Sequence, residues 1–64
     1  MWTYQFASLQ FALVISVDYR CASGHLIHER TLTLDYADNG TVSLDDVERR
    51  AGHDVALAYA EWRH

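Results

Sequence analysis

The feature that most constrains this fold is an alternation of apolar and polar residues that spans residues 11–36 and reverses at a turn. One parity of its first half is apolar, namely Phe11, Leu13, Ile15, Val17 and Tyr19, and one parity of its second half is largely apolar, namely Leu26, Leu32, Leu34 and Tyr36. Since the side chains of a strand point alternately to its two faces, each half predicts a half-buried strand. Ser23 and Gly24 supply the turn between them, so a long β-hairpin is expected.

The register of this hairpin follows from pairing its two apolar faces. Folding the chain about Ser23 and Gly24 gives the inward pairs Cys21–Leu26, Tyr19–His28, Val17–Arg30, Ile15–Leu32, Leu13–Leu34 and Phe11–Tyr36, and the outward pairs Ser16–Thr31 and Val14–Thr33. A shift of one residue would set the apolar side chains against polar ones, which favours this register. One conflict remains, because Asp18 falls opposite Glu29 and like charges repel in that position.

Three aromatic residues at alternate positions, Trp2, Tyr4 and Phe6, predict a further strand at the N-terminus. Their parity is opposite to that of the hairpin. Either a β-bulge near residues 7–8 bends one long strand, or a turn there separates two strands. The stripe has two interpretations: it belongs to the core, or Trp2 and Tyr4 stay partly exposed as a binding patch or dimer seam.

The C-terminal third predicts a turn and a helix. Residues 37–42 are expected to form an Asn-Gly turn followed by a short strand. Ser43 then fits an N-cap, with Asp46 three residues later. The apolar residues that follow at steps of three or four are Leu44, Val47, Ala51, Val55, Ala58 and Trp62. This stripe can cover the inward face of the hairpin, either as one rod or with a break at Gly52, where Asp54 would cap a second helix.

Length and patterning together predict one α+β domain over residues 1–64. The architecture expected is a small antiparallel sheet, made of the long hairpin 11–36 plus short strands, packed against a C-terminal helix that is kinked or broken at Gly52 or continuous through it. A chain of 64 residues buries only about 60% of the surface that it exposes when unfolded. Its margin of stability is therefore small, and a homodimer or a bound partner would add buried surface.

The amino-acid composition and net charge argue against several classes of function. The net charge is −4 and all five basic residues are Arg, which argues against direct binding of nucleic acid and favours a protein partner with a basic surface. The single cysteine, Cys21, cannot form an internal disulfide. The apolar run at residues 11–17 is too short to span a membrane, and no basic residue precedes it. A cytoplasmic location without membrane contact is expected, in the host cell if a phage encodes the protein.

The cysteine and histidine residues do not form a recognisable metal site or catalytic site. Cys21 and His25 flank the hairpin turn, and His28 follows on the strand. Their spacing matches no zinc finger, and His25 and His28 point to opposite faces of a strand. A thiol activated by His25 at a hairpin tip would lack a pocket and an orienting third residue. No enzyme activity, cofactor or metal is therefore predicted.

One segment carries a motif-level resemblance. The residues in matching places are Val47, Ala51 and Gly52. With these, residues 46–61 resemble the helix-turn-helix of bacterial repressors, which implies a small DNA-binding regulator as an alternative function. The departures from that family are Glu48, His53 and Glu61. Residues 55–62 also contain no Arg or Lys to reach phosphates or bases.

The leading function is binding to a protein through an acidic surface. The carboxylates expected to form it are Asp35, Asp38, Asp45, Asp46 and Glu48. Such a patch can imitate nucleic-acid phosphates and speed association with a basic site. In size, charge and layout the chain resembles small acidic phage inhibitors such as anti-CRISPR proteins, which implies a non-enzymatic inhibitor of a partner such as a CRISPR effector. A self-associating structural subunit, joined through its N-terminal aromatics, is the third alternative.

Overall fold

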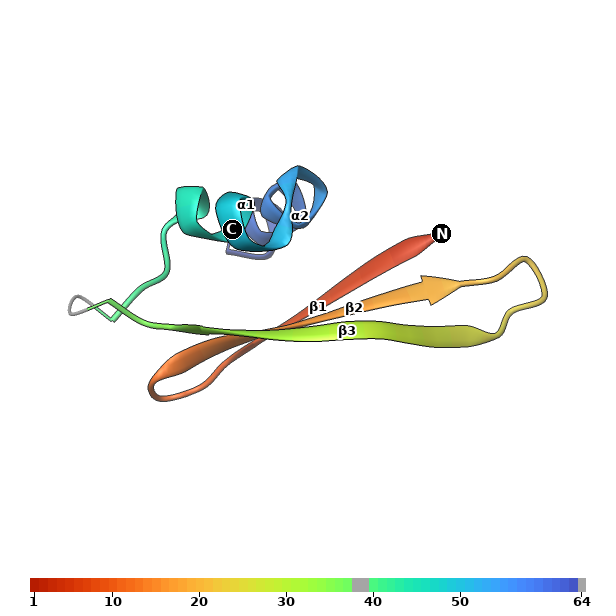
Figure 1. The fold of residues 1–64 in the computed structure, drawn as a ribbon, viewed down its shortest axis with the longest axis horizontal. Helices are drawn as coiled ribbons and strands as arrows, with labels where there is room; N and C mark the ends of the chain where they lie inside the picture. Colours follow the sequence, from red (N-terminus) through yellow and green to blue (C-terminus); the bar gives the residue numbers. More distant parts are fainter. Residues whose placement is uncertain (38–39, 64) are drawn as a thin grey trace.

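The computed structural model describes residues 1–37 and 40–63, which form a sheet and a helical layer (Figure 1). The strands are β1 (Trp2–Ser8), β2 (Ala12–Arg20) and β3 (Leu26–Asp35), and the helices are α1 (Leu44–Ala51) and α2 (His53–Arg63). Both helices lie over one face of the sheet, here called the inner face, and the β2–β3 turn extends well past them. The α+β layout expected from the sequence is confirmed.

The sheet is an antiparallel meander in the order β1-β2-β3. The N-terminal aromatics form a separate strand, which was one of the two arrangements expected. Tyr4 lies opposite Val17 and Phe6 lies opposite Ile15, so the aromatic stripe shares the inner face. Phe6 then packs against α2, with its ring centroid 5.6 Å from that of Tyr59 and 5.4 Å from that of Trp62.

The predicted hairpin register is correct at its centre and wrong near the turn. The pairs from Leu13–Leu34 to Val17–Arg30 form as expected, but a β-bulge follows and leaves Glu29 without an opposite residue. Beyond it, Tyr19 pairs with Ile27 instead of His28, and Leu26 pairs with Arg20 instead of Cys21. The bulge separates Asp18 from Glu29 and places it opposite His28, which replaces a repulsion with an attraction.

The inward face also ends earlier than predicted at both ends of β2. Phe11 lies in the turn before β2 and is 75% exposed, although its carbonyl oxygen still accepts a hydrogen bond from the Tyr36 backbone N–H at 3.0 Å. Tyr19 is on the inner face but 39% exposed, because that part of the sheet extends past the helices. An alternating pattern identifies the face of a side chain and not whether another layer covers it.

Residues 41–42 do not form the short strand that was expected. Val42 is instead buried in the core from an irregular segment, and its carbonyl oxygen accepts a hydrogen bond from the Tyr59 hydroxyl at 3.0 Å. The Gly40 N–H donates a hydrogen bond to the Ala37 carbonyl oxygen at 2.8 Å, and Asn39 of the predicted Asn-Gly turn lies outside the described residues. Tyr59 thus links α2 to the segment that leads into α1.

The helical segment is broken at Gly52. Ser43 caps α1 as predicted, with its hydroxyl oxygen accepting a hydrogen bond from the Asp46 N–H at 3.1 Å. Gly52 ends α1 with φ of 105° and ψ of 165°, and α2 begins at the next residue. Because the break turns α2 relative to α1, Ala56 and Tyr59 are buried where the single stripe predicted Ala58 and Trp62.

The core lies between the inner face and the two helices. Its buried members are Leu13, Ile15, Val17, Leu34, Val42, Val47, Ala51, Val55, Ala56 and Tyr59. Tyr4, Phe6, Leu32 and Tyr36 pack against them while partly exposed. The core therefore depends on every strand and on both helices.

Replacement of Gly52 tests the break directly. The Gly52→Ala variant is expected to lose on the order of 1–3 kcal/mol of unfolding free energy, since this φ,ψ region is essentially restricted to glycine. No heavy atom lies within 4 Å of an added Cβ, so the loss would come from the backbone alone. Urea unfolding measures it, with Arg50→Ala as the exposed control; an unchanged stability of Gly52→Ala would contradict the assigned conformation.

A second pair of variants tests the corrected end of the apolar face. Leu13→Ala is expected to cost about 2–5 kcal/mol, because Leu13 is 1% exposed and its loss leaves a cavity. Phe11→Ala is expected to change stability by no more than about 0.5 kcal/mol. Chemical denaturation of both variants distinguishes the two side chains, and equal losses would show that Phe11 is a core residue after all.

Candidate binding cleft

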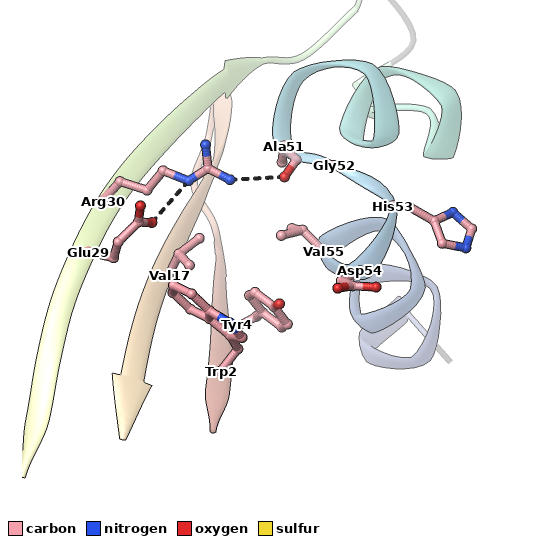
Figure 2. A pocket seen from close by; sticks show the side chains of 10 residues that line it. All are labelled: Trp2, Tyr4, Val17, Glu29, Arg30, Ala51, Gly52, His53, Asp54 and Val55. Atoms are coloured by element: carbon pink, nitrogen blue, oxygen red, sulfur yellow. Dashed lines mark hydrogen bonds and ion pairs between the residues drawn. The ribbon is translucent and has the colours of Figure 1, made fainter. Parts of the chain in front are cut away.

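A cleft of about 340 Å³ lies between the inner face of the sheet and the junction of the two helices (Figure 2). Its lining residues are Trp2, Tyr4, Val17, Glu29, Arg30, Ala51, Gly52, His53, Asp54 and Val55. All three strands and both helices contribute, so the cleft exists only in the folded chain. The break at Gly52 forms part of its helical side.

The sheet side of the cleft is aromatic. Trp2 and Tyr4 are alternate residues of β1 and therefore lie on the same face, beside Val17 of β2. The Trp2 ring meets the Tyr19 ring edge-on, with 5.1 Å between centroids and 70° between planes. Val55, a core residue that is 3% exposed, lines the helical side. Aromatic and aliphatic side chains thus form opposite sides of one small space.

Arg30 connects the sheet to the end of α1 across this cleft. Its guanidinium donates a hydrogen bond to the Ala51 carbonyl oxygen at 3.0 Å, and its Nε lies 3.3 Å from a Glu29 carboxylate oxygen. The Ala51 carbonyl belongs to the last turn of a helix, where the helix dipole favours a cation. The positive charge of Arg30 is therefore already met by two acceptors of the same chain.

Two polar groups of the cleft have no such partner. Neither the Asp54 carboxylate nor the Tyr4 hydroxyl makes a hydrogen bond or ion pair with residues 1–37 and 40–63. His53 differs, since it points away from the cleft and its Nδ1 lies 3.1 Å from a Glu48 oxygen. Asp54 was expected to cap α2 but lies within its first turn. Its carboxylate is left available to a ligand.

Beside the cleft lies an apolar shelf made of Trp2, Tyr19 and Ile27, and Trp2 also lines the cleft. These residues lie opposite one another in adjacent strands, two positions along β2 from Val17, so they share the inner face with it. They are 50%, 39% and 53% exposed. This end of the sheet extends past both helices, so the apolar shelf is an uncovered continuation of the core face.

The residues selected from the sequence are distributed over several surfaces. Trp2 and Tyr4 meet in the cleft. Asp45, Asp46 and Glu48 lie together on α1, where Asp46 pairs with Arg49 and Glu48 with His53. Asp35 pairs with Ala12, one position from the buried Leu34, and so lies on the outer face of the sheet. Asp38 falls outside the described residues.

Sequence reasoning missed Tyr19, Ile27 and Asp54 as site residues. Ile27 reaches the inner face only because of the bulge at Glu29. The repulsion expected between Asp18 and Glu29 was the one signal that pointed to such a bulge. No sequence pattern separated Asp54 from the other carboxylates.

The outer face holds a hydrogen-bonded trio. Asp18, only 6% exposed, accepts a hydrogen bond from His28 Nδ1 at 2.8 Å, and His28 Nε2 lies 2.9 Å from the Thr31 hydroxyl. Since a carboxylate can only accept, the proton of neutral His28 is on Nδ1 and the Thr31 hydroxyl donates to Nε2. This order resembles that of a catalytic triad, but the cleft lies on the other face of the sheet. The trio explains how a buried carboxylate is accommodated in β2.

The trio generates a stability prediction. His28→Ala is expected to cost about 1–3 kcal/mol, because it leaves the buried Asp18 carboxylate without its hydrogen bond. The same change in an Asp18→Ala background is expected to cost less, since the carboxylate is gone. Urea unfolding of the four proteins measures the coupling, with exposed His25→Ala as a control. Equal costs in both backgrounds would show that the contact contributes nothing.

The chain matches no protein-family model, no curated protein and no solved structure. Within the described parts of the chain, no three His, Cys, Asp or Glu side chains are grouped so as to hold a metal ion. Neither α1 nor α2 has the length and apolar character needed to cross a membrane.

Proposed function

We propose that this protein is a non-enzymatic binding module that docks on a protein partner with a basic surface. The observation that carries the proposal is the exposed apolar shelf of Trp2, Tyr19 and Ile27, which shares Trp2 with the cleft. Half-exposed aromatic side chains next to a cleft are the anchors that protein interfaces favour. The shelf would supply buried apolar area, and the cleft would receive a side chain of the partner.

Charge supports a basic protein as the partner. The chain carries a net charge of −4, and the ionised side chains that line the cleft are Glu29, Arg30 and Asp54. Phosphates of a nucleic acid would meet two carboxylates there and only one cation, which is already paired. A basic protein surface would meet complementary charge, which raises the rate of association and disfavours other partners.

The carboxylates of α1 have a supporting role in this proposal. Asp46 and Glu48 are paired within the chain and are followed by Arg49 and Arg50, so they are poor direct anchors. They still add to the overall negative field, which acts over about 10 Å at moderate salt. An inhibitor that covers the nucleic-acid-binding site of its partner, such as a CRISPR effector, is the specific form that we propose.

The break at Gly52 favours one alternative, a helix-turn-helix DNA-binding regulator, because that function requires two crossing helices. The junction here is a single residue between α1 and α2, whereas such motifs use a turn of about three or four residues. The exposed residues of α2 also include the acidic Asp54 and Glu61. These features favour a protein partner over DNA.

The test is capture of partners on tagged protein, with nuclease treatment, followed by binding measurements on the purified partner. The double variant Trp2→Ser, Tyr19→Ser removes two anchors of the apolar shelf and is expected to lower affinity at least about 100-fold, as expected for two interface anchors. Leu57→Ser, an exposed apolar site on α2, is the matched control and is expected to bind normally. Asp45→Ser, Asp46→Ser and Glu48→Ser together should slow association, and more so at low salt.

The outcomes separate the functions. A nuclease-resistant protein partner that is lost with the double variant and kept with Leu57→Ser supports the proposal. Recovery of DNA, or only of further copies of this chain, would overturn it in favour of the regulator or the self-associating subunit. A partner retained equally by all variants would show that the apolar shelf is not the binding surface.

A further inference from the structure

We infer that the cleft binds the cationic side chain of an Arg or Lys on the partner, held between Trp2 and Tyr4 on one side and the Asp54 carboxylate on the other. This inference rests on the proposed function and names what the cleft receives. It follows from the size of the cleft, the charges that remain unpaired in it and the surfaces that line it.

The size of the cleft suits a single side chain. Its volume of about 340 Å³ is at the lower end of the range of about 300–1,000 Å³ typical of ligand pockets. The partly exposed rings of Trp2 and Tyr4 provide apolar surface for a methylene chain, as the stems of Arg and Lys require. The almost completely buried Val17 and Val55 line the cleft beside them. The apolar shelf, which shares Trp2 with the cleft, allows the rest of the partner to pack outside it.

Asp54 determines the sign of the ligand charge. Arg30, the only Arg or Lys lining the cleft, already contacts Glu29 and the Ala51 carbonyl oxygen. His53 is directed toward Glu48. Asp54 has no hydrogen bond or ion pair within the described ranges and is exposed. An anionic ligand would be repelled by Asp54 and Glu29, whereas a cation would gain a charge-assisted hydrogen bond.

The aromatic side favours a cation as well. Trp and Tyr rings attract Arg and Lys through their faces, and Trp does so most strongly. The chain already contains this contact elsewhere, since the Arg63 guanidinium carbon lies 5.3 Å from the centre of the Tyr59 ring. The Tyr4 hydroxyl adds an oxygen that can accept a hydrogen bond from an ammonium or guanidinium group.

A second copy of this chain is a weaker occupant than a basic partner. Each copy has a net charge of −4, so two copies repel each other before any contact forms. A partner with a basic surface is drawn to the same cleft by the same field. The inference therefore commits to an Arg or Lys of a different protein.

The experiment titrates the whole chain with three capped tripeptides, acetyl-Gly-Arg-Gly-amide, acetyl-Gly-Lys-Gly-amide and acetyl-Gly-Gln-Gly-amide, and follows ¹⁵N–¹H NMR spectra. The cationic peptides are expected to shift the Trp2 indole N–H and the backbone signals of residues 52–55, and the Gln peptide to shift neither. Asp54→Asn is expected to weaken binding about fivefold or more, and Trp2→Leu similarly. Glu61→Gln, an exposed carboxylate on α2 outside the cleft, is the control and should leave the affinity unchanged.

Several results would overturn the inference. These are equal shifts with the Gln peptide, no shifts with any peptide at tens of millimolar, or unchanged affinity of Asp54→Asn. The NMR spectrum of each variant also reports whether it is folded. The docking proposal is tested separately, by partner capture with the Trp2 and Tyr19 double variant. If the cleft binds no cation but the double variant loses the partner, docking through the apolar shelf is still supported. If the partner instead binds that double variant as tightly as the unsubstituted chain, docking through the apolar shelf is wrong.

Discussion

The backbone conformation of Gly52 is the constraint on which the rest of the molecule depends. A continuous helix over residues 44–63 would be about 30 Å long, close to the length of about 33 Å of the ten-residue β3. Such a rod could cover the inner face from end to end. The turn at Gly52 divides it into segments of 8 and 11 residues that lie together over part of a molecule 43 Å long. The cleft and the uncovered apolar shelf are consequences of this shortened layer.

A single extra residue in β3 sets the chemistry of that uncovered region. Without the bulge at Glu29, His28 would face inward beside Tyr19 and Ile27 would face outward, because parity alternates along a strand. The bulge reverses both, so that Ile27 completes the apolar shelf and His28 reaches Asp18 on the outer face. Removing the repulsion between Asp18 and Glu29 therefore also gives the inner face its apolar end.

Much of the fold could be predicted from local patterns, and the site could not. The alternation from Leu13 to Val17 determines both the strand and its register, and Ser43 identifies the start of α1 through its own hydrogen bond. Whether Phe11 or Tyr19 is covered depends on the helical layer, which comes from residues far along the chain. The position of the bulge could be suspected only from one unfavourable pair, and the cleft required knowledge of how the helices cross the sheet.

The same limit applies to charge, because pairing and not composition decides which carboxylates can bind a ligand. The cluster at the start of α1 is the densest acidic region of the sequence, yet Asp46 and Glu48 are paired with Arg49 and His53. Asp18 is committed to His28, and Glu29 to Arg30. Asp54 is isolated in the sequence, but it is the unpaired carboxylate that lines the cleft. A ligand is selected by the charge that the fold leaves uncompensated in a confined space, and here that charge is negative and faces two aromatic rings.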